Sequence, residues 1–325
     1  MDRRAFLGLA ACALVGIPST ARFQPPRVYR IGYLHPSDSR DVGYAAFRKA
    51  LKDYGYVIGQ NTILEERFAE NNVARMPAMA LELVAKRVDI IVAVSPVAIR
   101  AARAATRTIP IVMGFSGDDP VKSGFASTLA RPGGNTTGLT TMALDMAPKW
   151  LELLRDFMPS LRAAAVLRSP GRADHAAQID ALQTAARAYG IRLQVVEVRG
   201  VDEYADAFAA MVSAGSQAVV VLSGPEFMHN RYTLVDLVRK HRLPSVYQYA
   251  DFVVIGGLVS YGPDIVDLTA RAADYVDKIL KGANPAELPI EQPRSPFLVI
   301  NRKSASMLGL VVPTALLLQA DQVIQ

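Results

Sequence analysis

The regular alternation of strands and helices is the feature that most constrains the fold of this chain. Short apolar runs such as Ile90–Val94 and Ala218–Leu222 lie between segments whose apolar residues recur at helical spacing. Parallel strands need helical crossovers of this kind, whereas hairpins do not. The alternation begins near Val28 and starts again after the glycine-rich stretch 133–138, which indicates a lobe crossing. We therefore predict an α/β fold of two Rossmann-like lobes with parallel sheets.

Three of the predicted strands end in serine followed by proline, directly or after one glycine. These junctions are Ser95-Pro96, Ser169-Pro170 and Ser223-Gly224-Pro225. Serine is a frequent N-cap and proline is tolerated in the first helical turn, so each junction predicts a helix start. Such junctions lie at the carboxyl edge of a parallel sheet, where amide donors point outward and open α/β folds bind ligands. We expect two such edges to face each other across a binding cleft.

The first 26 residues have the layout of an export signal with a short linker. Arg3 and Arg4 precede the uncharged run Ala5–Ile17, which is too short to span a bilayer, and residues 19–21 are small enough for signal-peptidase cleavage. The twin arginines fit a Tat or a Sec signal, and lipidation of Cys12 is the less favoured alternative. We expect a periplasmic protein. Because Cys12 is the only cysteine, cleavage after residue 21 leaves no disulfide and no thiolate metal site.

Charge and motifs argue against several function classes. The net charge of +6 is spread among acidic neighbours without a basic block, so we do not expect nucleic-acid binding. The sequence has no nucleotide-binding fingerprint, complete nucleophile elbow or zinc motif, and its four histidines are widely spaced. We therefore predict a binding protein rather than an enzyme, and expect no metal and no cofactor.

Six sequence blocks, spread over nearly the whole mature chain, carry a family resemblance. They are LKDYGYVIGQN at 51–61, DPV at 119–121, LARPGGNTTG at 129–138, GGLVSYGP at 256–263, KGA at 281–283 and LVIN at 298–301. In their order they resemble the ABC-transporter substrate-binding proteins of the TrpX type. The resemblance implies a type I periplasmic binding fold, with two lobes joined by three crossings. We accordingly divide the chain into lobe 1, residues 27–138 and 259–288, and lobe 2, residues 139–258 and 289–325.

The resemblance also implies a function. Proteins of this type are similar to receptors that close on a small carboxylate, such as an aromatic or branched amino acid, and present it to the permease and ATPase of an ABC importer. We expect a monomer that closes by a hinge at the crossings. Two alternatives stay open: a two-lobe enzyme of the racemase or glycosyltransferase type, and a sensor ectodomain.

An amino acid needs donors for its carboxylate, an anion for its ammonium group and an apolar or stacking surface for its side chain. The same residues have simpler explanations, since serines cap helices and aromatic residues pack in cores. With that alternative open, we predict as ligand-binding residues the serines and their neighbours at the strand ends, four aromatic residues and two acids: Ser95, Pro96, Ser116, Ser169, Ser223, Gly224, His35, Tyr33, Phe115, Tyr247, Tyr261, Asp118 and Glu226.

One departure from the family pattern concerns residues 250–251. Relatives often carry Arg-Glu after the segment that corresponds to Tyr247-Gln248-Tyr249, whereas this chain has Ala250-Asp251. If that pair touches the ligand or stabilises closure, the ligand of this chain differs.

Overall fold

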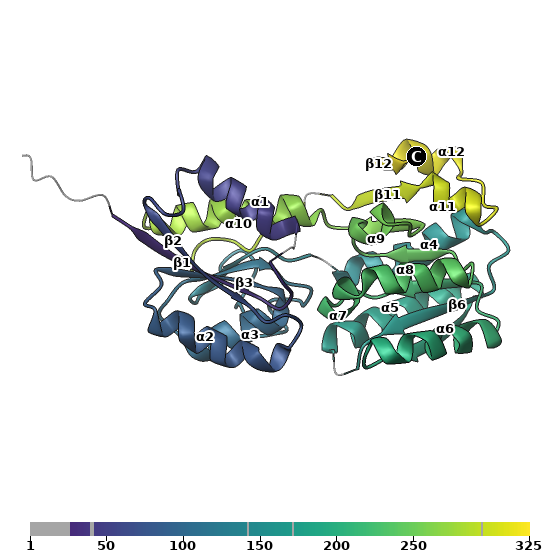
Figure 1. Ribbon diagram of the computed structural model, residues 1–325, viewed down its shortest axis with the longest axis horizontal. Coiled ribbons are helices and arrows are strands. Elements are labelled where there is room, and N and C mark those ends of the chain that lie inside the picture. The colour runs from purple at the N-terminus through teal and green to yellow at the C-terminus, as the bar shows by residue number, and fades with distance from the viewer. Residues whose placement is uncertain (1–26, 40–41, 142, 171, 294) are drawn as a thin grey trace, which may run out of the picture.

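The computed structural model describes residues 27–39, 42–141, 143–170, 172–293 and 295–325. These residues form two lobes that lie side by side, each built on its own sheet (Figure 1). The predicted export signal, with Arg3, Arg4 and Cys12, lies outside the described residues. No helix in the described ranges is both long enough and apolar enough to cross a membrane.

Lobe 1 contains, within the described residues, a five-stranded parallel sheet in the order β2-β1-β3-β4-β5. Helices α1 and α10 cover one face, and α2 and α3 cover the other (Figure 1). In chain order its elements are β1 (Tyr29–His35), α1 (Val42–Asp53), β2 (Thr62–Phe68), η1 (Val73–Arg75), α2 (Met76–Ala85), β3 (Ile90–Val94), α3 (Ser95–Ala105), β4 (Ile111–Phe115), β5 (Thr136–Gly138) and, much later, α10 (Ile265–Leu280).

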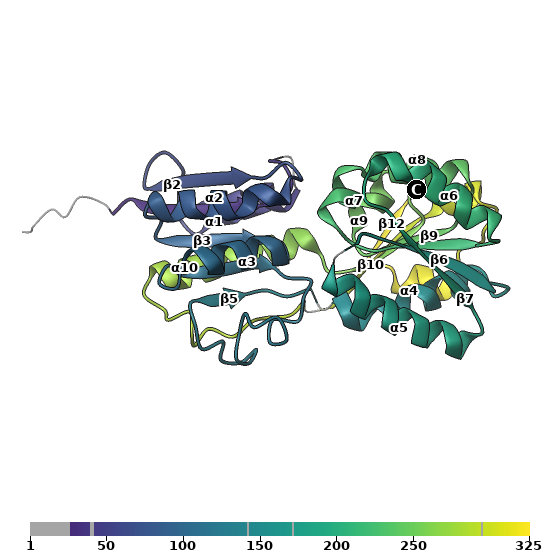
Figure 2. The same cartoon turned by 90° about the horizontal axis from the view of Figure 1, so that it is seen from below.

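Lobe 2 contains, in the described part of the chain, a seven-stranded sheet in the order β12-β11-β10-β9-β8-β6-β7. Helices α4 and α5 cover one face, and α6 to α9 lie over the other (Figure 2). Its elements are α4 (Ala143–Phe157), β6 (Ala163–Arg168), α5 (Ala173–Tyr189), β7 (Arg192–Glu197), η2 (Val201–Glu203), α6 (Tyr204–Ser213), β8 (Ala218–Val221), α7 (Pro225–His229), α8 (Arg231–Lys240), β9 (Ser245–Tyr247), α9 (Ala250–Val254), β10 (Val259–Gly262), β11 (Phe297–Asn301), α11 (Arg302–Met307), α12 (Thr314–Gln319) and β12 (Gln322–Ile324).

The predicted α/β architecture of two lobes is confirmed, with one antiparallel pair, β10 and β11. The predicted boundary at residue 259 is wrong, because β10 pairs with β9 and β11 in the sheet of lobe 2. Gly256-Gly257 forms the turn between α9 and β10. A side chain at Gly257 would meet the ring of Tyr247 at 2.5 Å, so this glycine allows a close approach within lobe 2. The crossing itself follows Gly262.

The helix starts differ from what the Ser-Pro junctions predict. Helix α4 begins at Ala143 and contains Pro148 in its interior, and residues 225–240 form two helices that meet at Asn230. At the Ser-Pro junctions, no serine side chain caps α3, α5 or α7, whose N-cap residues are Val94, Arg172 and Gly224. The predicted capping role of these serine side chains is therefore wrong.

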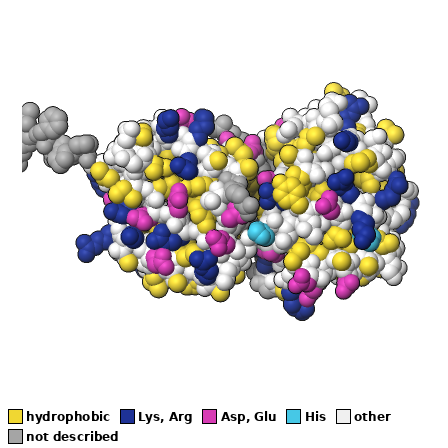
Figure 3. All heavy atoms as spheres, in the orientation of Figure 1, with side chains coloured by type: hydrophobic (Ala, Val, Ile, Leu, Met, Phe, Trp, Pro, Cys, Tyr) yellow, Lys and Arg dark blue, Asp and Glu magenta, His cyan; other side chains and the backbone are white. Residues whose placement is uncertain are grey.

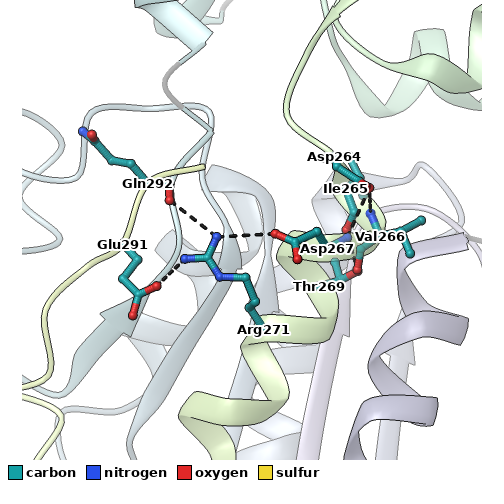
Figure 4. Close-up of polar contacts among 8 residues, drawn as sticks. All are labelled: Asp264, Ile265, Val266, Asp267, Thr269, Arg271, Glu291 and Gln292. Carbon is teal, nitrogen blue, oxygen red and sulfur yellow. Dashed lines mark hydrogen bonds and ion pairs between the residues drawn. The ribbon is translucent and has the colours of Figure 1, made fainter. Parts of the chain in front are cut away.

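The crossings between the lobes are joined to one another. The amide of Thr140, in the first crossing, donates to the carbonyl of Glu291 at 3.0 Å, and the amide of Glu291 donates to Gly138 at 2.9 Å. The Glu291 carboxylate pairs with Arg271 of α10, the helix that follows the second crossing (Figure 4). Arg271 also contacts Asp267 at 3.5 Å and the Gln292 carbonyl at 3.5 Å. This network ties the first and third crossings to each other and to α10 of lobe 1.

We expect Gly138→Ala to destabilise the protein strongly, because Gly138 joins β5 to the first crossing at φ +126°. A methyl group there would lie 2.4 Å from the Met113 carbonyl oxygen. The expected loss is about 2 kcal/mol or more in the free energy of unfolding, measured by urea denaturation. Gly134→Ala is the control, since a methyl group at Gly134 meets no atom within 4 Å. Equal stability of the two variants would contradict this account of the crossing.

Candidate ligand-binding site

A cavity lies where the carboxyl edges of the two sheets face each other, and both lobes supply its walls. Acidic and basic side chains border the line along which the lobes meet (Figure 3). From lobe 1 the walls include His35, Pro36, Ser37, Val42, Val94, Ser95, Pro96, Phe115, Gly117 and Ile265; from lobe 2 they include Arg172, Ser223, Gly224, Pro225, Met228, Tyr249 and Asp251.

A β-bulge shapes the wall of lobe 1. Strands β3 and β4 pair in register up to Ala93 and Met113, after which Val94 pairs with Phe115 and Gly114 is left over. A side chain at Gly114 would approach Val94 to 2.9 Å, so the strands can come this close only at a glycine. Bulges of this kind redirect the side chains at a strand end. Here the two residues that follow, Ser95 and Phe115, both reach the cavity.

His35 forms the neighbouring part of this wall, at the end of β1. The residue is 3% exposed, and its Nδ1 accepts a hydrogen bond from the Ser37 amide at 3.1 Å. An accepting Nδ1 places the proton of the neutral ring on Nε2, so Nε2 is a donor. The ring also stacks on Tyr33, with 6.0 Å between ring centroids.

A buried histidine positions the wall of lobe 2. His175 of α5 is fully buried; its Nδ1 accepts from the Ser169 amide at 3.2 Å, and its Nε2 donates to the Ser223 carbonyl at 2.7 Å. These two bonds tie the loop after β6 to the loop after β8. The second loop carries Ser223 and Gly224 into the cavity wall. His175 is therefore a positioning residue for this wall.

Aromatic side chains and side chains of opposite charge line the same cavity. Phe115 of lobe 1 lies edge-on to Tyr249 of lobe 2, with 6.5 Å between ring centroids and 60° between ring planes. Arg172 and Asp251, both from lobe 2, add a guanidinium and a carboxylate to the walls. At the mouth, Asp38 of lobe 1 lies 3.9 Å from His229 of lobe 2. The cavity thus combines aromatic surfaces with groups for both ends of a zwitterion.

Six of the thirteen predicted residues line this cavity: His35, Ser95, Pro96, Phe115, Ser223 and Gly224. The sequence signal was the same for all six, since each lies at the end of a parallel strand or within three residues after it. Their contact with a ligand stays a prediction.

Two predicted aromatic residues are core residues instead. Tyr33 is 1% exposed and packs against Tyr44 and Phe47 in lobe 1. Tyr247 is 1% exposed and stacks on Phe252, and its burial raises the pKa of its phenol. Each ring lies two residues before a wall residue, His35 or Tyr249, so it packs in the core below the edge that carries the cavity.

The remaining predicted residues are engaged within their own lobes. Tyr261 packs on the core of lobe 2, where its carbonyl accepts from Trp150 Nε1. Ser116 bonds to the Asp118 backbone, and the Asp118 carboxylate pairs with Arg100 at 2.7 Å. The Ser169 hydroxyl donates to Glu226, so these two residues satisfy each other. None of these five is among the residues that line the described walls.

Sequence reasoning missed Arg172, Tyr249 and Asp251 as wall residues. One signal was available for Asp251, because this position departs from the pattern of the related proteins. Arg172 and Tyr249 lie in loops without a distinctive motif, so only the fold places them on the cavity. In the described part of the chain, no cluster of three or more His, Cys, Asp or Glu residues is arranged to hold a metal ion.

The family model of ABC transporter substrate-binding proteins matches residues 34–324. The chain belongs to this family. The family is one of substrate-binding proteins rather than enzymes, and its members bind small molecules as components of ABC transporters. The two lobes have the type I periplasmic binding fold.

Solved structures and characterised relatives agree with this assignment. A tyrosine-binding protein of Clostridioides difficile (strain R20291) is 26% identical over 278 residues, which are 85% of this chain and 78% of that protein. The structure of an ABC domain from Streptococcus pneumoniae in complex with L-Trp is 26% identical, with a TM-score of 0.83 over 91% of this chain and 100% of that one. A conserved domain protein of Vibrio cholerae, 24% identical with a TM-score of 0.84 over 91% and 100% of the two chains, has the same fold.

We expect His175→Phe to destabilise lobe 2 by about 2 kcal/mol or more, because the buried Ser169 amide and Ser223 carbonyl would each lose a partner. Urea denaturation measures the loss. His241→Phe is the matched control, since His241 is partly exposed at the end of α8 and stacks on Phe208. If His175→Phe unfolds at the wild-type urea concentration, the positioning role is wrong.

Proposed function

We propose that this chain is the extracytoplasmic receptor of an ABC importer and that it binds an aromatic α-amino acid between its lobes. This proposal rests on one observation: a single cavity is lined by two aromatic residues, Phe115 and Tyr249, and by two charged residues, Arg172 and Asp251. An aromatic amino acid has a ring, a carboxylate and an ammonium group. The walls offer aromatic faces for the ring, donors for the anion and a carboxylate for the cation.

The charges favour an amino acid over an aromatic acid without an amine. Asp251 would repel such an acid, whereas an α-ammonium group pairs with it. The relatives support the same class: one is named a tyrosine-binding protein, and another was solved with L-Trp. Phe115 and Tyr249 fit this class better than a small aliphatic ligand, since ring contacts add about 0.5–1.5 kcal/mol each beyond burial.

The proposed mechanism is closure of the lobes on the ligand. A ligand that contacts Phe115 of lobe 1 and Tyr249 of lobe 2 favours the closed state, because the open state offers only one of these contacts. The pairing of Asp38 with His229 across the mouth adds a second contact that closure forms. The closed form is then the one presented to the permease and ATPase. On this proposal the chain is exported by the signal in its first 26 residues and acts as a periplasmic monomer.

A ligand screen with the purified protein tests this proposal. We expect L-tyrosine, L-tryptophan or L-phenylalanine to raise the melting temperature, since a ligand at a hundred times its Kd stabilises the folded state by about 2.7 kcal/mol. Branched amino acids and 3-phenylpropionate should have smaller effects. If no aromatic amino acid changes the melting temperature or gives heat in titration calorimetry, this ligand class is wrong.

The role of Asp251 is tested separately by Asp251→Asn. We expect this variant to bind the amino acid about tenfold or more weakly, because a charged hydrogen bond contributes about 1.5–3 kcal/mol. Asp119→Asn is the control: it makes the same change of charge at a turn outside the cavity. Unchanged affinity of Asp251→Asn would show that the ammonium group binds elsewhere.

A further inference from the structure

Helices α11 and α12 and the segment between them form an apolar surface on lobe 2, next to its edge strand β12 (Figure 1). Residues 304–320, which make up most of this region, contain no charged side chain. Val311 and Leu318 are each 83% exposed, more than any other large apolar side chain of the described residues. Val311 also lines a hollow of about 400 Å³, together with the half-buried Leu310, Val312 and Leu317. Exposed apolar side chains that lie together in this way are typical of an interaction site.

Basic side chains from two parts of the chain border this surface. Arg302 and Lys303 begin α11, while Lys240 ends α8 and Arg242 follows it closely. The Arg242 guanidinium donates to the carbonyl of Met307, the last residue of α11, at 3.2 Å, so the end of α8 lies against α11. A second hollow, of about 420 Å³, has Lys240, Arg242 and Met307 in its walls. The cations and the apolar side chains therefore belong to one surface.

The four cations are not neutralised by neighbouring acids. All four are exposed, and none forms an ion pair with a residue that the structure describes. The two acids close to them in sequence are engaged elsewhere. Asp236 pairs with Arg239 at 3.5 Å, and the Asp321 carboxylate accepts from the Leu298 amide at 2.8 Å. The surface thus carries net positive charge around an apolar centre.

This combination of groups fits an anionic lipid surface. Lysine and arginine are attracted to lipid phosphates, and aliphatic side chains enter the boundary between headgroups and acyl chains. Val311 and Leu318 carry no directional polar group, and a fluid lipid surface needs no matching shape. A protein partner would instead need acids placed opposite four separate cations. The family acts with ABC transporters, so a membrane is close to the place where this chain works.

We propose that the surface formed by α11, α12 and the end of α8 binds the anionic phospholipids of a membrane. Lys240 and Arg242 precede β9, so this surface lies toward the amino edge of the sheet, whereas the cavity lies at the carboxyl edge. None of the residues that line its two hollows belongs to the described walls of the cavity. Lipid binding therefore leaves the cavity accessible. It holds lobe 2 at the membrane, while lobe 1 stays free to move.

Vesicle binding tests this proposal. The chain is used without its predicted export signal, because that apolar run would itself bind lipid, and both sheets lie in the residues that remain. The probes are vesicles of phosphatidylcholine alone and of phosphatidylcholine mixed in equal parts with phosphatidylglycerol. Co-sedimentation gives the partition coefficient. We expect binding to the mixed vesicles to be stronger by at least about tenfold, and to fall at high salt because salt screens the attraction between charges.

A first pair of variants separates this surface from the general positive charge of the protein. Arg302→Gln combined with Lys303→Gln should weaken binding to the mixed vesicles at least about tenfold, since each cation near an anionic surface contributes roughly fivefold. Arg48→Gln combined with Lys49→Gln is the matched control, because it removes an exposed Arg-Lys pair from α1 of lobe 1. The control should bind as wild type does.

A second pair of variants tests the apolar contribution. Val311→Ser combined with Leu318→Ser should weaken binding at least about tenfold, because two aliphatic side chains no longer enter the lipid. Val73→Ser combined with Leu81→Ser is the control, since these residues of lobe 1 are 48% and 59% exposed. All four variants should melt at the wild-type temperature, because the replaced side chains are exposed.

Three results would overturn the proposal. The first is a wild-type protein that does not bind the mixed vesicles, which would leave this surface to a protein partner. The second is unchanged binding by either variant of the surface. The third is an equal loss in the matched control of either pair, which would show that lipid attracts the protein's overall charge or apolar surface rather than this part of it.

Discussion

The backbone pairing between the first and third crossings is the constraint on which the rest of the structure depends. Gly138 and Thr140 exchange hydrogen bonds with Glu291, and Arg271 joins Glu291 to the helix that follows the second crossing. Because these segments are tied together at one side of lobe 1, the carboxyl edges of the two sheets remain opposed. A parallel sheet collects its loops at that edge, so opposing two such edges gathers the loops of both lobes around one cavity. The proposed hinge lies in these segments, between the cores of the two lobes.

The two walls of the cavity are built differently. Lobe 1 contributes a bulge at Gly114 and a strained serine at a helix start, both of which are fixed by local backbone geometry. Lobe 2 contributes loops that are held by side chains, with His175 as the link between two of them.

The fold could be predicted from the sequence because it depends on periodicity, which is a local signal. The strand ends could be predicted for the same reason, and they yielded His35, Ser95, Phe115 and Ser223 as wall residues. Which residue near a strand end reaches the cavity could not be predicted, since Tyr33 and Tyr247 are buried whereas His35 and Tyr249, two residues later, line the walls. The loop residues Arg172 and Tyr249 could not be predicted as wall residues either, because their positions depend on contacts between distant segments.

The central claim is that a ligand held by both lobes closes them, and a distance measurement between the lobes tests it most directly. Leu81 of α2 and Val212 of α6 are 59% and 44% exposed and lie in different lobes (Figure 1). Both can be replaced by cysteine and spin-labelled, since the chain's own cysteine, Cys12, lies in the predicted export signal. Double electron–electron resonance between the two spin labels should give a long, broad distance distribution without ligand. With a saturating aromatic amino acid the distribution should be shorter and narrower. An identical distribution under both conditions, at ligand concentrations that raise the melting temperature, would contradict closure.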